Sequence, residues 1–162
     1  RFCAHNGGGA MTTRTRSLTF LAVITSALFA GAVSASAAPR VIEITANDQM
    51  KYNITTMTAK PGEELKVVLT NAGTLPKEAM GHNWVLLKAG TDMTAFANAA
   101  MTAKDTDYIA PAKKGDVLAF IPVLGPKKTG EVIFKAPAAG EYTFICSFPG
   151  HYMLMKGTLT VK

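Results

Sequence analysis

The stretch EYTFICSFPGHYMLMKGTLTVK, residues 141–162, holds two runs of strand-like sequence joined by a short loop. In the first run apolar and polar residues alternate, so Tyr142, Phe144 and Cys146 share one face. We expect this face to point into a hydrophobic core. A Pro-Gly dipeptide, typical of a tight turn, follows the first run, and the chain then returns along KGTLTVK. The stretch therefore predicts two consecutive β-strands.

The same alternation of short strand and turn extends over the rest of the chain. Six further runs are strand-like: VIEIT (41–45), MKYNITTMTA (50–59), LKVVLTNAG (65–73), NWVLLK (83–88), DVLAFIPVL (116–124) and GEVIFKA (130–136). The Pro-Gly turn in KPGEE predicts that the second and third of these runs pair with each other. The pattern as a whole predicts an all-β fold, a β-sandwich.

Residues 91–105 are the exception to this pattern. Their apolar side chains recur at helical spacing, and either Thr91 or Asp92 can act as the N-cap. We therefore expect one short helix inserted between strands.

The amino end has the pattern of a secretory signal peptide. Met11 is followed by two arginines, an apolar run and the small residues SASAA. The apolar run is shorter than the roughly 20 residues that a transmembrane helix needs. We predict a signal peptide over residues 11–37 that is cleaved after Ala37. Residues 1–10 precede the plausible initiator methionine and are interpreted as upstream sequence. This leaves a single exported domain, residues 38–162, with no membrane insertion of the mature chain.

Composition narrows the possible functions of this domain. The whole chain has 17 basic and 11 acidic residues, and loss of the three arginines before residue 38 leaves a net charge of +3. The lysines are scattered, so nothing indicates nucleic-acid binding. The mature chain would keep one cysteine, Cys146, and two histidines, His82 and His151. A lone cysteine in an exported protein is buried and inert, reactive, or bound to a metal.

Spacing favours the metal interpretation. Cys146 and His151 lie on the two arms of one loop and Met155 starts the return strand, so their donor atoms can converge on one ion. These soft ligands favour copper over magnesium or calcium. His82 supplies a second imidazole, and Gly81 before it allows a close approach of the backbone. Two histidines, a cysteine and a weak axial methionine are the ligands of blue-copper electron-transfer sites.

Simpler interpretations remain for each residue and for the function. Met155 can be an ordinary core residue, His82 an ordinary histidine and Cys146 a small buried hydrophobe. Copper sequestration or delivery is the main alternative function, although such sites are usually exposed and rich in several Met or His ligands. A cysteine hydrolase would need an orienting group and an oxyanion donor, and it gives no reason for Met155. A structural zinc site is disfavoured because methionine is a poor zinc ligand.

The motifs resemble those of the azurin family of cupredoxins, the periplasmic type 1 (blue) copper proteins of bacteria. The resemblance rests on GHNWVL at 81–86 followed later by C-x4-H-x3-M at 146–155. It extends to NDQM at 47–50, LPKEAMGHNWVLL at 75–87 and MKGTLTVK at 155–162. It implies a Greek-key sandwich of eight strands with the helix as a flap outside it, one mononuclear copper ion, a periplasmic location and electron transport in place of catalysis. We expect a monomer.

The resemblance also implies a role for each residue of the site. His82, Cys146 and His151 would form the trigonal plane around copper. Met155 would be the long axial contact on one side, and the backbone carbonyl of Gly81 the contact on the other. Three residues would support these ligands: Asn83 through hydrogen bonds between the two ligand loops, Ser147 where azurins commonly have threonine, and Phe148 through a backbone N–H directed at the sulfur.

Other redox proteins are the expected partners of this domain. An apolar patch around the edge of His151 would dock transient redox proteins such as cytochromes or copper and haem oxidoreductases. Its members are expected to be Leu75, Met80, Phe148, Pro149 and Met153. Azurins usually carry a disulfide that clamps the first strands, and the mature chain has no cysteine left to form it.

Overall fold

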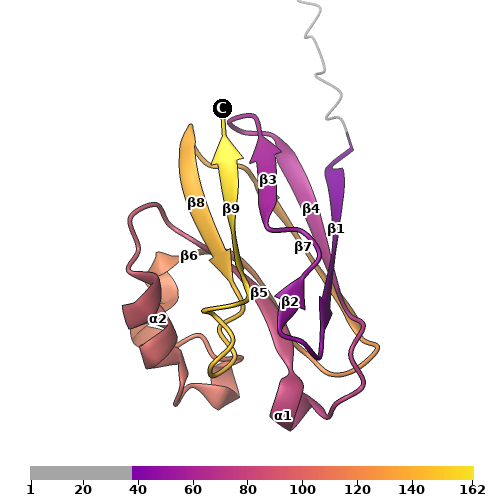
Figure 1. Ribbon diagram of the computed structural model, residues 1–162. Helices are drawn as coiled ribbons and strands as arrows, with labels where there is room; N and C mark the ends of the chain where they lie inside the picture. Colours follow the sequence, from indigo (N-terminus) through magenta and orange to yellow (C-terminus); the bar gives the residue numbers. More distant parts are fainter. Residues whose placement is uncertain (1–37) are drawn as a thin grey trace, which may run out of the picture. The chain divides into compact units, whose positions relative to one another are not determined.

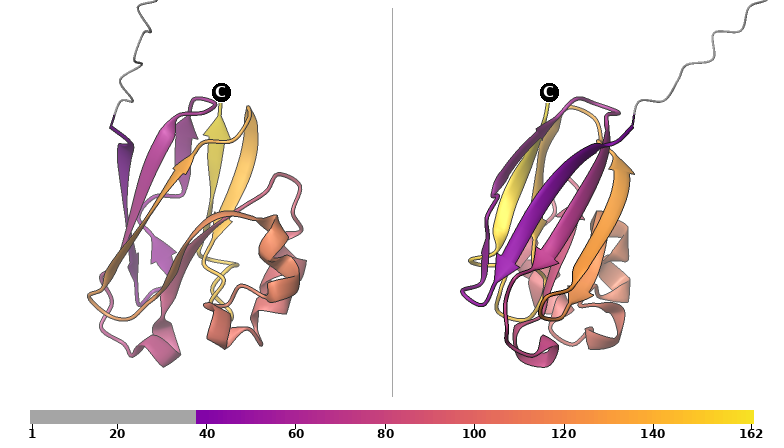
Figure 2. Two further views of the ribbon diagram at one scale, coloured as in Figure 1. Left: turned by 180° about the vertical axis from the view of Figure 1, so that it is seen from behind. Right: turned by 90° about the vertical axis from the view of Figure 1, so that its right-hand side faces the viewer.

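Two packed β-sheets form the protein in the computed structural model, which describes residues 38–162 (Figures 1 and 2). The predicted all-β sandwich is confirmed. The chain crosses repeatedly from one sheet to the other, as in a Greek key. The predicted signal peptide lies outside the described residues. Within the described part of the chain, no helix has the length and hydropathy needed to cross a membrane.

The first sheet has the strand order β2-β1-β4-β7. Its strands are β1 (Arg40–Asn47), β2 (Lys51–Tyr52), β4 (Glu64–Asn71) and β7 (Thr129–Lys135). β1 and β4 run parallel, and β4 pairs with β7 antiparallel. Every second residue of β4 is buried, because one face of this sheet packs on the core and the other faces solvent.

The second sheet has the order β3-β9-β8-β5-β6. Its strands are β3 (Thr56–Ala59), β5 (His82–Leu87), β6 (Val117–Leu124), β8 (Gly140–Ile145) and β9 (Lys156–Val161). All six residues of β5 are buried, in contrast to the alternating strands of the first sheet. Both faces of this strand are therefore covered.

The helix α2 (Met93–Ala100) provides the second cover and confirms the predicted inserted helix. Asp92 caps it, since its carboxylate accepts a hydrogen bond from the Ala95 N–H at 3.0 Å. Phe96 packs with Val85, Leu87 and Ile145 in a small cluster on the outer face of the second sheet.

Three short helical segments were not predicted: α1 (Lys77–Met80) and the 3₁₀ segments η1 (Lys104–Thr106) and η2 (Pro111–Asp116). Each is too short for its hydrophobic periodicity to be visible in the sequence.

The predicted pairing of residues 50–59 with 65–73 is wrong. The first run divides into β2 and β3, and β3 pairs with β9, whereas β4 pairs with β1 and β7. The Pro-Gly turn therefore carries the chain from one sheet to the other. Gly62 takes a φ of 76° in this turn, which reverses the chain direction but does not decide whether the flanking strands share a sheet.

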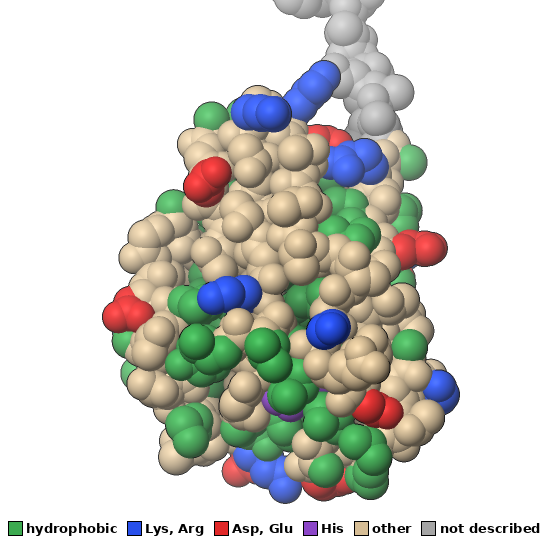
Figure 3. Space-filling view, viewed as in Figure 1, with side chains coloured by type: hydrophobic (Ala, Val, Ile, Leu, Met, Phe, Trp, Pro, Cys, Tyr) green, Lys and Arg blue, Asp and Glu red, His purple; other side chains and the backbone are tan. Residues whose placement is uncertain are grey.

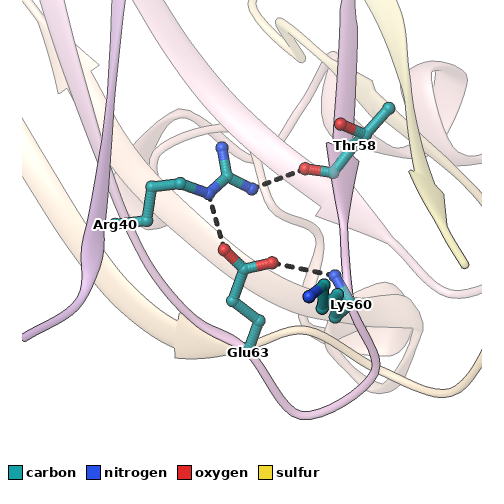
Figure 4. A network of polar contacts seen from close by, with 4 residues as sticks. All are labelled: Arg40, Thr58, Lys60 and Glu63. Atoms are coloured by element: carbon teal, nitrogen blue, oxygen red, sulfur yellow. Dashed lines mark hydrogen bonds and ion pairs between the residues drawn. The ribbon is translucent and has the colours of Figure 1, made fainter. Parts of the chain in front are cut away.

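A polar network holds the two sheets together beside this turn (Figure 4). Arg40 of β1 donates from Nε to Glu63 at 2.6 Å and from its guanidinium to the Thr58 carbonyl of β3 at 2.6 Å. Glu63 also accepts from the Lys60 N–H at 2.8 Å. The hydrogen bond from Arg40 lowers the pKa of Glu63. The carboxyl end of β9 lies at this end of the sandwich, so the loop between β8 and β9 lies at the other (Figure 1).

Candidate metal centre

Three potential metal ligands converge at the end of the sandwich opposite the Arg40 network. His82, Cys146 and His151 each offer one donor atom, and these atoms all lie within 4.8 Å of one another. The Cys146 Sγ lies 3.6 Å from the His151 Nδ1, and the centroids of the two imidazole rings are 5.1 Å apart. Cys146 and His82 are fully buried, and His151 is 3% exposed. The three residues therefore enclose a small site within the protein.

His82 is placed by the transition from α1 to β5. It is the first residue of β5, and Gly81 before it ends α1. A Cβ atom on Gly81 would lie 2.5 Å from Val123 Cγ1 and 2.6 Å from the Lys77 carbonyl oxygen. Only glycine fits this close approach, so the backbone that precedes His82 is fixed by packing.

The loop between β8 and β9 holds Cys146, His151 and Met155 through its own backbone hydrogen bonds. The Cys146 N–H donates to the Met155 carbonyl at 2.9 Å, and the Met155 N–H donates to the His151 carbonyl at 2.8 Å. The turn requires Gly150, whose φ is 81°. Met155 is fully buried. The loop conformation is therefore held by backbone hydrogen bonds and does not depend on a bound metal ion.

Asn83 connects this loop to the start of β5. Its Oδ1 accepts from the Ser147 N–H at 2.8 Å, and its Nδ2 donates to the Ser147 hydroxyl at 2.8 Å. The same Nδ2 donates to the Asp107 carbonyl at 2.9 Å. Asn83 and Ser147 are buried, so water does not compete for these bonds. The two segments that carry the candidate ligands are therefore joined by side-chain hydrogen bonds.

The electrostatics of the site suit a metal ion. Neither ring nitrogen of His82 has a hydrogen-bond partner among the residues that the structure describes. Burial lowers the pKa of His82, and burial lowers the pKa of His151 to about 4. At neutral pH both rings are therefore neutral and offer a lone pair. A buried ring nitrogen without a hydrogen-bond partner is unfavourable, and a bound metal ion would satisfy it. The His82 ring therefore fits a metal ligand.

The thiol of Cys146 is protonated when no metal is bound. Burial raises its pKa to about 12, although the N–H groups of Asn83 and Phe148 and the hydroxyl of Tyr52 act in the opposite direction. A metal ion that binds here must displace this proton, as metals do at thiol ligands. The nearby donors stabilise the negative charge that results.

Sequence reasoning missed Tyr52 and Asp107. The hydroxyl of Tyr52 donates to the Asn83 carbonyl, and a carboxylate oxygen of Asp107 accepts from the Val123 N–H at 3.0 Å. Tyr52 faces inward in an alternating run, which predicts its burial but not its partner. Asp107 lies in a turn with a φ of 53° and has no sequence signal for its contacts.

Hydrophobic side chains surround the small area of histidine that reaches the surface at this end of the molecule (Figure 3). Of the expected patch, Leu75 and Met153 are exposed and Met80 and Pro149 are half-buried. Phe148 is buried and packs against the His151 ring, with the ring centroids 4.6 Å apart and the ring planes tilted by 39°. Leu154, which was not expected, is exposed next to Met153.

Comparison with known proteins agrees with this geometry. Residues 40–162 match the sequence profile of the copper binding proteins of the plastocyanin/azurin family. Azurin of Pseudomonas fluorescens biotype A is 41% identical over 128 residues, which cover 75% of this chain and 97% of that protein. Azurin of Pseudomonas aeruginosa is 38% identical over 125 residues, which cover 75% of this chain and 84% of that protein.

Solved structures give the same result. The structure of auracyanin A, described as a "blue" copper protein from Chloroflexus aurantiacus, is 36% identical with a TM-score of 0.69. The alignment covers 77% of this chain and all of that one. The chain thus belongs to the plastocyanin/azurin family of copper binding proteins, and its cofactor is copper.

Proposed function

We propose that this protein is a blue copper protein that carries single electrons between redox partners. His82, Cys146 and His151 would hold the ion, with Met155 and the Gly81 carbonyl as weaker contacts. The observation that carries the proposal is the buried convergence of two neutral imidazoles and one thiol within 4.8 Å. When bound, copper supplies a one-electron couple between its cuprous and cupric forms.

The protein groups around the site favour fast electron transfer because they resist rearrangement. The loop of Cys146 and His151 is fixed by backbone bonds, and Asn83 ties it to His82 on the neighbouring strand. The donors therefore keep one arrangement whichever charge the ion carries. Burial also keeps water away, which limits the change in solvation on each transfer.

Two other functions of copper proteins, delivery of the ion and catalysis, fit this site less well. A delivery protein must pass its ion to a partner, and here the three donor residues are buried at the end of the core. A catalytic site needs a position for substrate and a general base. Both histidines are used as ligands in this proposal, so we infer an electron carrier that is not an enzyme.

Electrons would enter and leave through the patch that covers His151. We define this docking patch as Leu75, Met80, Pro149, Met153 and Leu154, with Phe148 beneath it. A small apolar patch suits brief contacts with another redox protein, such as a cytochrome or a copper or haem oxidoreductase.

We further propose that the mature protein is a single exported domain. Cleavage of residues 11–37 would leave residues 38–162 as one copper-binding domain in the periplasm. We propose that it acts as a monomer, because a carrier must expose its docking patch to successive partners.

Copper loading of the purified domain tests the proposed function. The expected result is an intense visible absorption band from thiolate-to-copper charge transfer and a reversible one-electron couple. Cys146→Ser should abolish the band because serine offers no thiolate, whereas Tyr142→Phe, at the other end of β8, should keep it. A loaded wild-type protein that lacks the band or the reversible couple would contradict the proposal.

A further inference from the structure

A β-bulge interrupts the pairing of β5 with β6 beside the metal centre. The register shifts directly after His82, so Asn83 lies opposite two residues of β6, Pro122 and Val123. Proline has no N–H group to donate. The Val123 N–H donates outside the sheet, to a carboxylate oxygen of Asp107 at 3.0 Å. On the β6 side, the bulge is therefore completed by a side chain that belongs to neither strand.

Asp107 also completes the bulge on the β5 side. Its backbone carbonyl accepts a hydrogen bond from Asn83 Nδ2 at 2.9 Å, and the same Nδ2 donates to the Ser147 hydroxyl at 2.8 Å. The Oδ1 of Asn83 accepts from the Ser147 N–H. Both hydrogens of the Asn83 carboxamide are therefore used, which fixes its orientation. One residue thus connects the start of β5 to the bulged part of β6.

The bond from Asp107 to Val123 also affects the backbone that precedes His82. Val123 is 5% exposed, and its Cγ1 would lie 2.5 Å from a Cβ atom on Gly81. Phe148 Cε2 closes the same space at 3.3 Å. Gly81 is therefore held by the packing of Val123 and Phe148, and a shift of Val123 would release it.

The turn that contains Asp107 has an unusual backbone. Asp107 has a φ of 53° and Tyr108 a φ of 57°, a left-handed conformation that aspartate adopts more readily than a bulky residue does. The Tyr108 ring packs edge-on against Phe148, with the ring centroids 5.0 Å apart. Within the described residues, Asp107 makes both hydrogen bonds that join residues 104–109 to β5 and β6. Without its side chain, this turn should move more freely beside the metal centre.

We propose that Asp107 is a positioning residue of the copper centre, which holds the start of β5 against β6 so that His82 and the ligand loop keep one spacing when the ion changes charge. This inference rests on the proposed electron-transfer function. Groups that hold metal ligands from outside typically change metal affinity or activity by about 10- to 100-fold when they are mutated. Asp107 acts through Asn83 and Val123, one contact further from the ion, so we expect a smaller effect.

The rate of electron self-exchange in the copper-loaded protein tests this role. It is measured by NMR line broadening in mixtures of both oxidation states. Asp107→Ala removes the acceptor and disfavours the left-handed backbone, so the rate should fall about fivefold. Asp107→Asn removes the same charge but keeps an acceptor oxygen and tolerates this backbone, so its rate should stay within about twofold of the wild-type rate.

Asp92→Ala is the matched control for a loss of stability. The Asp92 carboxylate also accepts one backbone N–H at 3.0 Å, but it caps α2. Both alanine variants should lower the urea midpoint, whereas only Asp107→Ala should slow self-exchange. In the cuprous protein, the Ser147 N–H should also exchange faster with deuterium in Asp107→Ala, because Asn83 loses its fixed orientation. Asp107→Gly removes the acceptor without straining the backbone, and it provides the same comparison if Asp107→Ala does not fold.

The self-exchange rates decide the role of Asp107. Wild-type rates in both Asp107→Ala and Asp107→Gly overturn the proposal. Equal slowing by Asp92→Ala or by Asp107→Asn also overturns it, because the cause would then be lost stability or lost charge. These failures are distinct from failure of the proposed function, in which the wild-type protein itself would lack the absorption band or a reversible couple.

Discussion

Single residues hold the copper centre together, and Asn83 is the one with the most connections. Asn83→Leu should lower the free energy of unfolding of the metal-free protein by about 3 kcal/mol, because it leaves the buried N–H and hydroxyl of Ser147 and the Asp107 carbonyl without partners. Urea unfolding measures this change. Trp84, which is fully buried and the single tryptophan of the chain, provides the fluorescence signal.

Ser147→Ala is the control for this prediction. It removes one hydroxyl, but Asn83 keeps its bonds to the Ser147 N–H and the Asp107 carbonyl. The expected loss is therefore only about 1 kcal/mol. If the two variants lose equal stability, the hydrogen bonds of the Asn83 side chain to the Ser147 N–H and the Asp107 carbonyl do not stabilise the loops.

Met155 should tune the copper centre without anchoring it. Met155→Leu keeps a similar volume in this fully buried position, so the fold should persist. Copper should stay bound, and the potential should rise by about 60 mV, a tenfold change in relative affinity, because a weak donor to the oxidised ion is lost. Voltammetry and metal analysis check both points. Met153→Leu, an exposed control, should leave the potential unchanged. Release of copper by Met155→Leu would show that Met155 is an anchor.

Among the strands, β9 requires a glycine opposite β8. Gly157 pairs with Phe144, and a Cβ atom there would lie 2.2 Å from Phe144 Cζ and 2.4 Å from the Thr55 carbonyl oxygen. Gly157→Ala should therefore lower the free energy of unfolding by about 2 to 3 kcal/mol through overpacking, as measured by urea unfolding. Because Phe144 precedes Cys146 by two residues, the displaced ring should also broaden the absorption band of the copper-loaded protein.

Gly115→Ala separates this steric effect from the general effect of replacing glycine. No atom lies within 4 Å of a Cβ at this position. The substitution should be neutral or stabilise the protein by about 0.5 kcal/mol, because alanine restricts the unfolded chain. Equal losses from the two variants would rule out the clash with Phe144 as the cause.

The strands also show how far the sequence determines the fold. Alternation of apolar and polar residues predicts strands such as β1, β4 and β9, because one face of each must be buried. Pairing is not predictable in this way: KPGEE is a turn in both a hairpin and a crossover, and only the packing of the whole core selects the crossover. The candidate ligands could be predicted because residues 38–162 contain only one cysteine and two histidines. Tyr52 could not, because its contact joins strands of different sheets.

At the scale of the whole described domain, the sandwich places the proposed site of electron exchange and the Arg40 network at opposite ends. The Arg40 network and the carboxyl terminus lie at one end, and the ligand loop lies at the other (Figure 1). The docking patch therefore lies away from Arg40 and the carboxyl terminus, and a change within it should affect partner contact without affecting the core.

A charge within the docking patch should slow electron transfer while leaving the copper centre intact. Met153→Glu places a carboxylate on a side chain that is 57% exposed, so two patches that meet face to face repel each other and bury unpaired charges. The rate of electron self-exchange, measured by NMR line broadening in mixtures of both oxidation states, should fall about tenfold at low salt. Ile133→Glu is the matched control, since Ile133 is 51% exposed in the middle of β7 and opposite Lys66. It makes the same change in net charge and should leave the rate nearly unchanged. Equal slowing by both variants would mean that electrons do not pass through this patch.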